Sequence, residues 1–102
     1  MLEKDFLKHC EDALLKLASE IEKQDSANKL EVEYSEGILE IVIAATGKTY
    51  VINRNSGNQK IWYSSPFSGA DYFSFDEKSS SWLNAKGDVL AQKLFSEIQK
   101  LF

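Results

Sequence analysis

Acidic side chains are the groups in this sequence with the clearest chemical potential. Glu22 and Asp25 are three residues apart, a spacing that makes them neighbours at the end of a helix. Glu31 and Glu33 are two residues apart in an alternating segment, so both are expected to leave a strand on its outward face. Carboxylate oxygens are the ligands that hard divalent cations accept. If the helix packs beside the strand, the two pairs form one open, weak metal strip; alternatively, they form a solvated face that keeps the protein soluble.

His9 and Cys10, each the only residue of its kind, are the other candidates. They are adjacent in a predicted helix and point about 100° apart, so they cannot act together as base and nucleophile. Cys10 belongs to an apolar stripe and is interpreted as a core residue. Asp5 and Asp12 lie one turn to either side of His9, as a divalent metal site would need, but neighbouring lysines compete for both carboxylates. A surface hydrogen-bonding role is therefore favoured for His9.

Composition and charge limit the function classes. The 102 residues, 43% of them hydrophobic, predict a single domain over 1–102 with one core. The net charge is −4, and residues 1–36 hold ten acids against five bases, which suits a cation or a basic protein surface rather than nucleic acid. A single cysteine excludes an internal disulfide and favours a reducing, cytoplasmic location. No apolar run approaches the roughly 20 residues of a membrane span, and the mixed charges at the N-terminus predict no targeting peptide.

The hydrophobic periodicity predicts a helix, a series of strands and a second helix. Apolar residues recur at three- and four-residue steps from Phe6 to Ile21, which is typical of an amphipathic helix. Asp88 is the predicted N-cap of a closing helix with Leu90 and Leu94 on its apolar face. Alternating segments separated by tight turns predict strands at 30–34, 38–43, 49–53, 60–64, 72–75 and 82–83. The expected fold is an α+β two-layer sandwich, with two helices on one face of an antiparallel sheet of about six strands.

The middle of the chain carries a specific pattern of short motifs. They are Thr-Tyr-Val-Ile-Asn at 49–53, Ile-Trp at 61–62, Ser-Ser-Pro at 64–66 and Ser-Gly at 68–69. This pattern strongly resembles the frataxin family, whose bacterial members are called CyaY. The resemblance extends to the acidic first helix, the glutamate-rich first strand, the turn at Gly37, Trp82 and the last helix. It thus covers nearly the whole chain and agrees with the predicted order of elements.

The resemblance implies a role in iron–sulfur cluster assembly. Frataxins bind iron weakly, as Fe2+ or Fe3+, and they dock on the cysteine desulfurase and its scaffold protein to adjust the rate of cluster formation. The iron-binding ridge of the family maps onto Glu11, Glu22, Asp25, Glu31 and Glu33. The partner surface of the family maps onto Asn53 and Trp62, with Lys60 where the family usually has glutamine. A monomer is expected in the absence of metal, and fewer adjacent acids than in many relatives imply fewer or weaker iron sites.

Physical reasoning leaves alternatives for these positions. Trp62 is expected to point outward, either as a binding hot spot or shielded by Tyr72. Asn53, which ends a strand, could equally cap its own backbone. A ferroxidase that oxidises Fe(II) to Fe(III) at the acidic strip is the runner-up function, although nothing predicts the preorganised ligands it would need. A single-strand nucleic-acid binder that stacks bases on Trp62, Tyr72 and Phe73 is disfavoured by the few basic residues of the sheet region.

Overall fold

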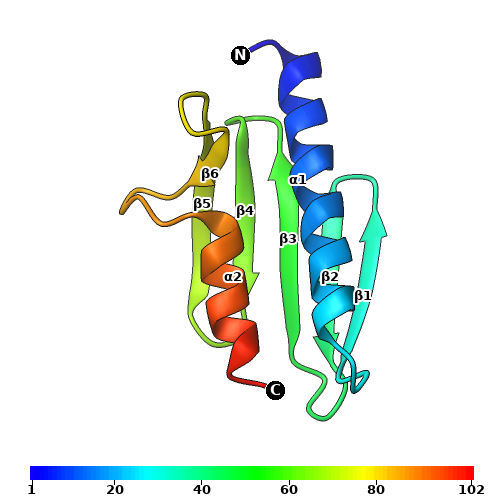
Figure 1. Cartoon of the computed structure of the whole chain (residues 1–102). Coiled ribbons are helices and arrows are strands. Elements are labelled where there is room, and N and C mark those ends of the chain that lie inside the picture. Colours follow the sequence, from blue (N-terminus) through cyan, green and yellow to red (C-terminus); the bar gives the residue numbers. More distant parts are fainter.

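Two helices cover one face of a six-stranded antiparallel sheet in the computed structural model, which describes residues 1–102 (Figure 1). The elements in chain order are α1 (Glu3–Gln24), β1 (Leu30–Ser35), β2 (Ile38–Ile43), β3 (Thr49–Asn55), β4 (Lys60–Ser65), β5 (Gly69–Asp76), β6 (Ser81–Leu83) and α2 (Leu90–Gln99). The strands are ordered in the sheet as they are in the chain, so every connection between strands joins neighbours. The predicted two-layer fold is therefore confirmed.

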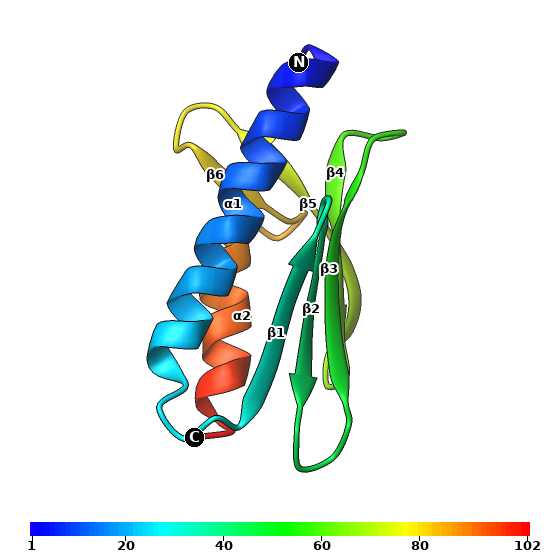
Figure 2. The ribbon, with the colours of Figure 1, turned by 90° about the vertical axis from the view of Figure 1, so that its right-hand side faces the viewer.

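The core lies between the two helices and the inner face of the sheet (Figure 2). It contains nineteen buried hydrophobic residues, among them Phe6, Leu14 and Trp82. Cys10 is fully buried in this cluster, which confirms its assignment as a core residue. Burial raises the pKa of the Cys10 thiol to about 12, so the thiol is protonated and unreactive at neutral pH. Neither helix combines the length and the apolar character needed to cross a membrane.

A two-residue turn at Glu36-Gly37 fixes the register of the first two strands. Both residues have positive φ, 36° and 81°, as tight hairpin turns that match the strand twist require. The Arg54 side chain packs against Gly37 so closely that a Cβ there would lie 2.6 Å from its Cδ atom. Any larger residue would therefore displace Arg54. The turn places Ser35 opposite Ile38, and this register determines which side chains meet further along both strands.

A partly buried carboxylate ties α2 to the sheet. Glu97 accepts hydrogen bonds from the hydroxyl groups of Tyr50 (3.2 Å), Tyr63 (2.8 Å), Ser65 (2.5 Å) and Ser68 (2.9 Å). Burial by itself would raise the pKa of Glu97, but these hydrogen bonds outweigh it and hold the pKa below its usual value. Burial, together with the carboxylate, raises the pKa of Tyr50 and of Tyr63. Nothing in the local sequence around Glu97 indicates this cluster.

The ends of several elements differ from the sequence prediction. β5 begins at Gly69 rather than at residue 72, because it pairs with β4 over that strand's whole length. The prediction that Asp88 caps α2 is wrong: the N-cap is Val89, and no side chain caps the helix. Asn84 organises this loop instead, since its Oδ1 accepts from the Asp88 N–H at 2.7 Å and its Nδ2 donates to the Asp88 carboxylate at 3.1 Å.

Candidate functional site

No helix covers the outer face of the sheet (Figure 2). The strand register brings the three predicted partner-binding residues together on this face. Asn53 on β3 lies directly opposite Trp62 on β4, and Lys60 precedes Trp62 by two residues on the same face. Ile61 and Tyr63 are fully buried on the inner face, so the expected outward orientation of Trp62 is confirmed.

Trp62 belongs to a row of side chains that crosses four strands. Register places Ile38, Asn53, Trp62 and Tyr72 side by side on β2, β3, β4 and β5. Ile38 and Tyr72, at the ends of the row, are each 43% exposed, whereas Trp62 is half-buried between its neighbours. The row is thus an exposed apolar stripe with one amide in it, a composition that suits a protein interface.

Only one of the two polar atoms of the Asn53 side-chain amide forms a hydrogen bond within the chain. Its Nδ2 donates to the carbonyl oxygen of Arg54 at 3.1 Å, so part of the expected backbone capping is present. Its Oδ1 is buried and accepts no hydrogen bond. Buried acceptors without a donor are rare in folded proteins, and this one lies in the middle of the exposed row.

Glu31 and Glu33 point to this same outer face at its β1 end. Glu33 lies directly opposite Glu40 on β2, and all three side chains are exposed. None of them forms an ion pair, since the two salt bridges of the chain are Lys23–Glu20 and Lys93–Asp71. Sequence reasoning missed Glu40, although the two-residue turn at Glu36-Gly37 would have fixed this pairing. Like charges directly opposite each other are destabilising, so this end of the face favours a cation or a basic partner.

Glu11 and Glu22 lie in the other layer of the molecule. Both are exposed on one stripe of α1, about 16 Å apart along the helix axis. α1 packs over the inner face of β1, whereas Glu31 and Glu33 project from its outer face. The predicted carboxylates therefore flank the free edge of β1 from two sides instead of converging. No group of three or more His, Cys, Asp or Glu side chains lies close enough together to hold a metal ion.

Asp25 has a structural role in the loop between α1 and β1. Its side chain is only 8% exposed. Its Oδ1 accepts from the Lys29 N–H and its Oδ2 from the Leu30 N–H, each at 2.8 Å. Because both carboxylate oxygens are engaged with the backbone, Asp25 is left out of the iron-binding residues proposed below.

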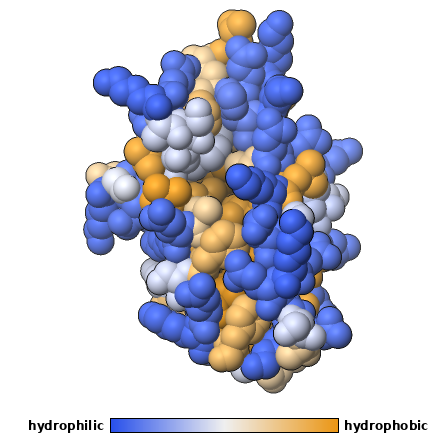
Figure 3. Space-filling model, viewed as in Figure 1, coloured by the Kyte–Doolittle hydropathy of each residue, from blue (hydrophilic) through white to orange (hydrophobic).

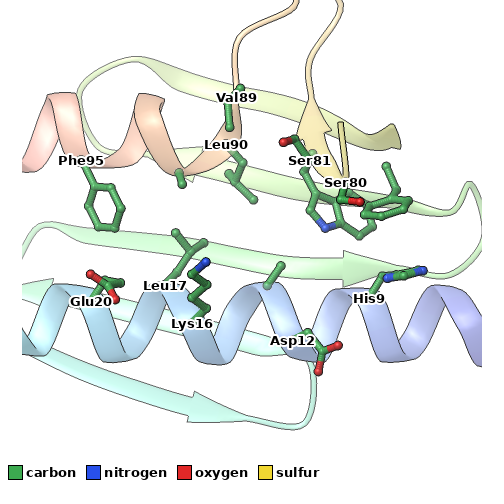
Figure 4. Close-up of a pocket in the computed structure, with 14 residues that line it drawn as sticks. His9, Asp12, Lys16, Leu17, Glu20, Ser80, Ser81, Val89, Leu90 and Phe95 are labelled. Carbon is green, nitrogen blue, oxygen red and sulfur yellow. The ribbon is translucent and has the colours of Figure 1, made fainter. Parts of the chain in front are cut away.

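His9 lies at one end of a cavity of about 400 Å³ between the helices (Figure 4). It stacks on the ring of Phe75 with ring centroids 4.1 Å apart and an interplanar angle of 15°. The expected hydrogen-bonding role is replaced by this stacking, because the end of the sheet lies close enough to α1 to cover the ring. Leu17, Leu90 and Phe95 point into the space between the helices, and Figure 3 shows an apolar band there.

Known proteins share the sequence pattern and the fold of this chain. Residues 1–102 match the family model of the frataxin-like domain. The chain belongs to the frataxin family. Mitochondrial frataxin of Dictyostelium discoideum is 39% identical over 82 residues, which cover 79% of this chain and 42% of that protein. The mitochondrial frataxin homolog of Schizosaccharomyces pombe is 31% identical over 99 residues, covering 96% of this frataxin and 60% of the relative. This frataxin thus spans about half the length of these relatives.

Solved frataxin structures share the fold. Trimeric frataxin from Saccharomyces cerevisiae, complexed with ferrous iron, superimposes with a TM-score of 0.77 at 32% identity over 90% of this chain and 83% of that one. Frataxin from Psychromonas ingrahamii gives a TM-score of 0.79 at 16% identity over 99% and 91% of the two chains, a likeness of fold. The similar proteins include mitochondrial and bacterial frataxins, so the comparisons support the family without singling out its bacterial branch.

Proposed function

We propose that this frataxin is an iron-binding regulator of iron–sulfur cluster assembly that docks on the cysteine desulfurase and its scaffold protein. The observation that carries the proposal is the helix-free outer face, on which Asn53, Lys60 and Trp62 lie together. The same face carries Glu31 and Glu33 three strands away, about 14 Å from the β4 residues at the usual strand spacing. One docked partner surface can cover both groups.

Trp62 and Asn53 supply different parts of the proposed contact. A tryptophan flanked by other side chains near the centre of a surface is the residue type most often found to dominate binding energy. The unused Asn53 Oδ1 is an acceptor that a donor from a partner satisfies once docking rearranges the row. Lys60 adds a positive charge beside Trp62, so this end of the face suits a partner with an acidic rim, while the β1 end suits a basic one.

Iron is proposed to bind as cargo at the facing carboxylates of Glu33 and Glu40, with Glu31 on the same face but too far away to complete a site of three carboxylates. Carboxylate oxygens fit a hard cation, and water completes the coordination shell where protein ligands are few. Such a site is weak and exchangeable, as a carrier that hands iron on requires. A solved yeast relative is complexed with ferrous iron, which supports iron binding in this family.

For assembly state and location we propose a monomer in the absence of metal that acts in a reducing, cytoplasmic compartment. The buried single cysteine fits reducing conditions. Solved yeast relatives are trimeric, and the similar sequences are named mitochondrial. Sedimentation velocity with and without Fe(II) tests the first, and cell fractionation tests the second.

Two matched variants test the docking proposal. Trp62→Ala removes the centre of the outer row, and Phe67→Ala removes a more exposed aromatic ring from the turn between β4 and β5. Trp62→Ala is expected to weaken binding to the cysteine desulfurase about tenfold or more, and to abolish the effect on cluster formation rate. Phe67→Ala is expected to leave both unchanged. Equal behaviour of the two variants would refute docking through this face.

A further inference from the structure

The free edge of β1 has backbone groups available for pairing. β1 has β2 on one side and no strand on the other. The Lys29 carbonyl accepts from the Ala44 N–H at 3.0 Å, so Lys29 and every second residue after it direct their backbone groups to β2. The residues between them, Leu30, Val32 and Tyr34, direct their N–H and C=O groups to the open edge.

Asp25 closes one end of this edge and leaves the rest open. Its Oδ2 accepts the outward N–H of Leu30 at 2.8 Å, which stops strand pairing at that residue. The N–H and C=O groups of Val32 and Tyr34 remain. They offer two complete donor–acceptor pairs, enough for a short antiparallel strand.

A groove runs beside these two residues under α1. It has a volume of about 470 Å³ and is lined by Leu15, Ala18, Ser19, Glu22, Lys23, Val32 and Tyr34. The small side chains of Ala18 and Ser19 leave room between helix and strand, and Leu15 is 45% exposed at its rim. A strand added about 4.8 Å from β1 would direct every second side chain into this groove.

Charge determines which kind of strand fits. Glu31, Glu33 and Glu40 are exposed on the outer face next to the edge and form no ion pair. Lys23, the one base that lines the groove, is paired with Glu20 at 3.9 Å. Carboxylates beside a free edge repel an acidic strand and lose hydration without compensation next to a neutral one, whereas a basic strand gains attraction.

We propose that the β1 edge accepts an extended segment of a partner protein as a seventh, antiparallel strand. The segment alternates apolar residues, which enter the groove under α1, with lysine or arginine residues, which lie beside Glu31 and Glu33. The strand-pairing proposal rests on the proposed function only in that both require a protein partner. It differs from the Trp62 row in position and in using backbone hydrogen bonds.

Synthetic peptides of about seven residues that alternate lysine and valine test the proposal. In the antiparallel register, the valine N–H groups face Val32 and Tyr34, and the lysine N–H groups face away. N-methylation of the valine amides is therefore expected to weaken binding about tenfold. The matched peptide with N-methylated lysine amides is expected to bind as the parent does. On binding of the parent, hydrogen exchange at the amides of Val32 and Tyr34 is expected to slow.

Specific results of these peptide-binding measurements would overturn the proposal. Equal affinities of the two methylated peptides, or weaker binding of the lysine-methylated one, would show that backbone pairing at this edge is absent. Unchanged affinity in a Glu31→Gln, Glu33→Gln double variant would refute the selection for a basic strand, since loss of both charges is expected to weaken binding about tenfold. The peptide assay uses no desulfurase and does not involve the Trp62 surface. Its result is therefore independent of the Trp62→Ala result.

Discussion

Replacement of Glu97 by alanine tests how the second helix is held to the sheet. The variant removes the acceptor of four hydroxyl groups, and two of these belong to the fully buried Tyr50 and Tyr63. A buried hydroxyl without a partner costs about 1–3 kcal/mol. Because Glu97 itself is half-exposed, water can reach part of the space, so the lower half of that range applies. The expected loss in the free energy of unfolding is about 2–4 kcal/mol, a large share of the stability of a domain this size.

Urea unfolding at pH 7, followed by the fluorescence of the two tryptophans, of which Trp82 is buried, measures this loss. Gln92→Ala, at an exposed position of the same helix, is the control and is expected to change stability by less than about 0.5 kcal/mol. In a Glu97→Ala background, Tyr63→Phe should cost about 1 kcal/mol less than in the parent protein, because its hydroxyl has already lost its partner.

The lowered pKa of Glu97 also predicts how its contribution to stability depends on pH. A carboxyl whose pKa is lower in the folded state stabilises the protein above its unfolded value, near 4.5, and this contribution is lost as the pH falls through the folded value. The stability difference between parent and Glu97→Gln should therefore be largest at neutral pH and shrink below about pH 4.5. A loss under about 1 kcal/mol in Glu97→Ala, or a Glu97→Gln difference that does not change with pH, would show that the hydroxyl groups do not stabilise the Glu97 carboxylate.

Three further experiments, on Asp25, Glu33 and Cys10, test the structure. Asp25→Ala leaves two backbone N–H groups without acceptors and should lower stability by about 1–3 kcal/mol, while Asp25→Asn, which keeps one good acceptor, should lose less; equal losses in urea unfolding would contradict the assigned role. Glu33→Gln removes the repulsion from Glu40 and should raise stability by a few tenths of a kcal/mol at low salt but not in about 1 M salt; a salt-independent gain would mean that another effect dominates. The Cys10 thiol, buried and with a pKa raised to about 12, should react with a thiol reagent at neutral pH about a hundredfold more slowly in the folded protein than in urea, and rapid native labelling would be inconsistent with its burial.

Local patterns predicted most of the fold. The alternation around Trp62 was enough to orient it, because its neighbours Ile61 and Tyr63 are apolar and a strand has a side-chain period of two. The spacing from Phe6 to Ile21 predicted the buried face of α1 for the corresponding reason in a helix. Tight turns between successive strands left an antiparallel meander as the simple topology, and the structure has it.

The arrangement of the site depended on contacts that periodicity does not encode. Glu22 and Glu33 lie in different layers because α1 packs on the inner side of β1. The sequence pattern did not determine how the helix packs against this strand. The sequence pattern predicts an exposed side chain for Asp25. In the structure, the loop that follows it folds back so that two backbone N–H groups donate to its carboxylate. The Glu97 cluster joins residues 29 to 47 positions apart, so no local signal could reveal it.

An amide NMR titration of this frataxin with purified cysteine desulfurase, without metal, shows whether the outer face of the sheet is the docking surface. Docking through this face is expected to shift or broaden the amide signals of residues 53–62 and of Glu31, Glu33 and Glu40, with α2 unaffected. An unchanged spectrum with excess desulfurase, or changes confined to α2, would contradict docking through this face and leave iron handling to be tested as the primary function.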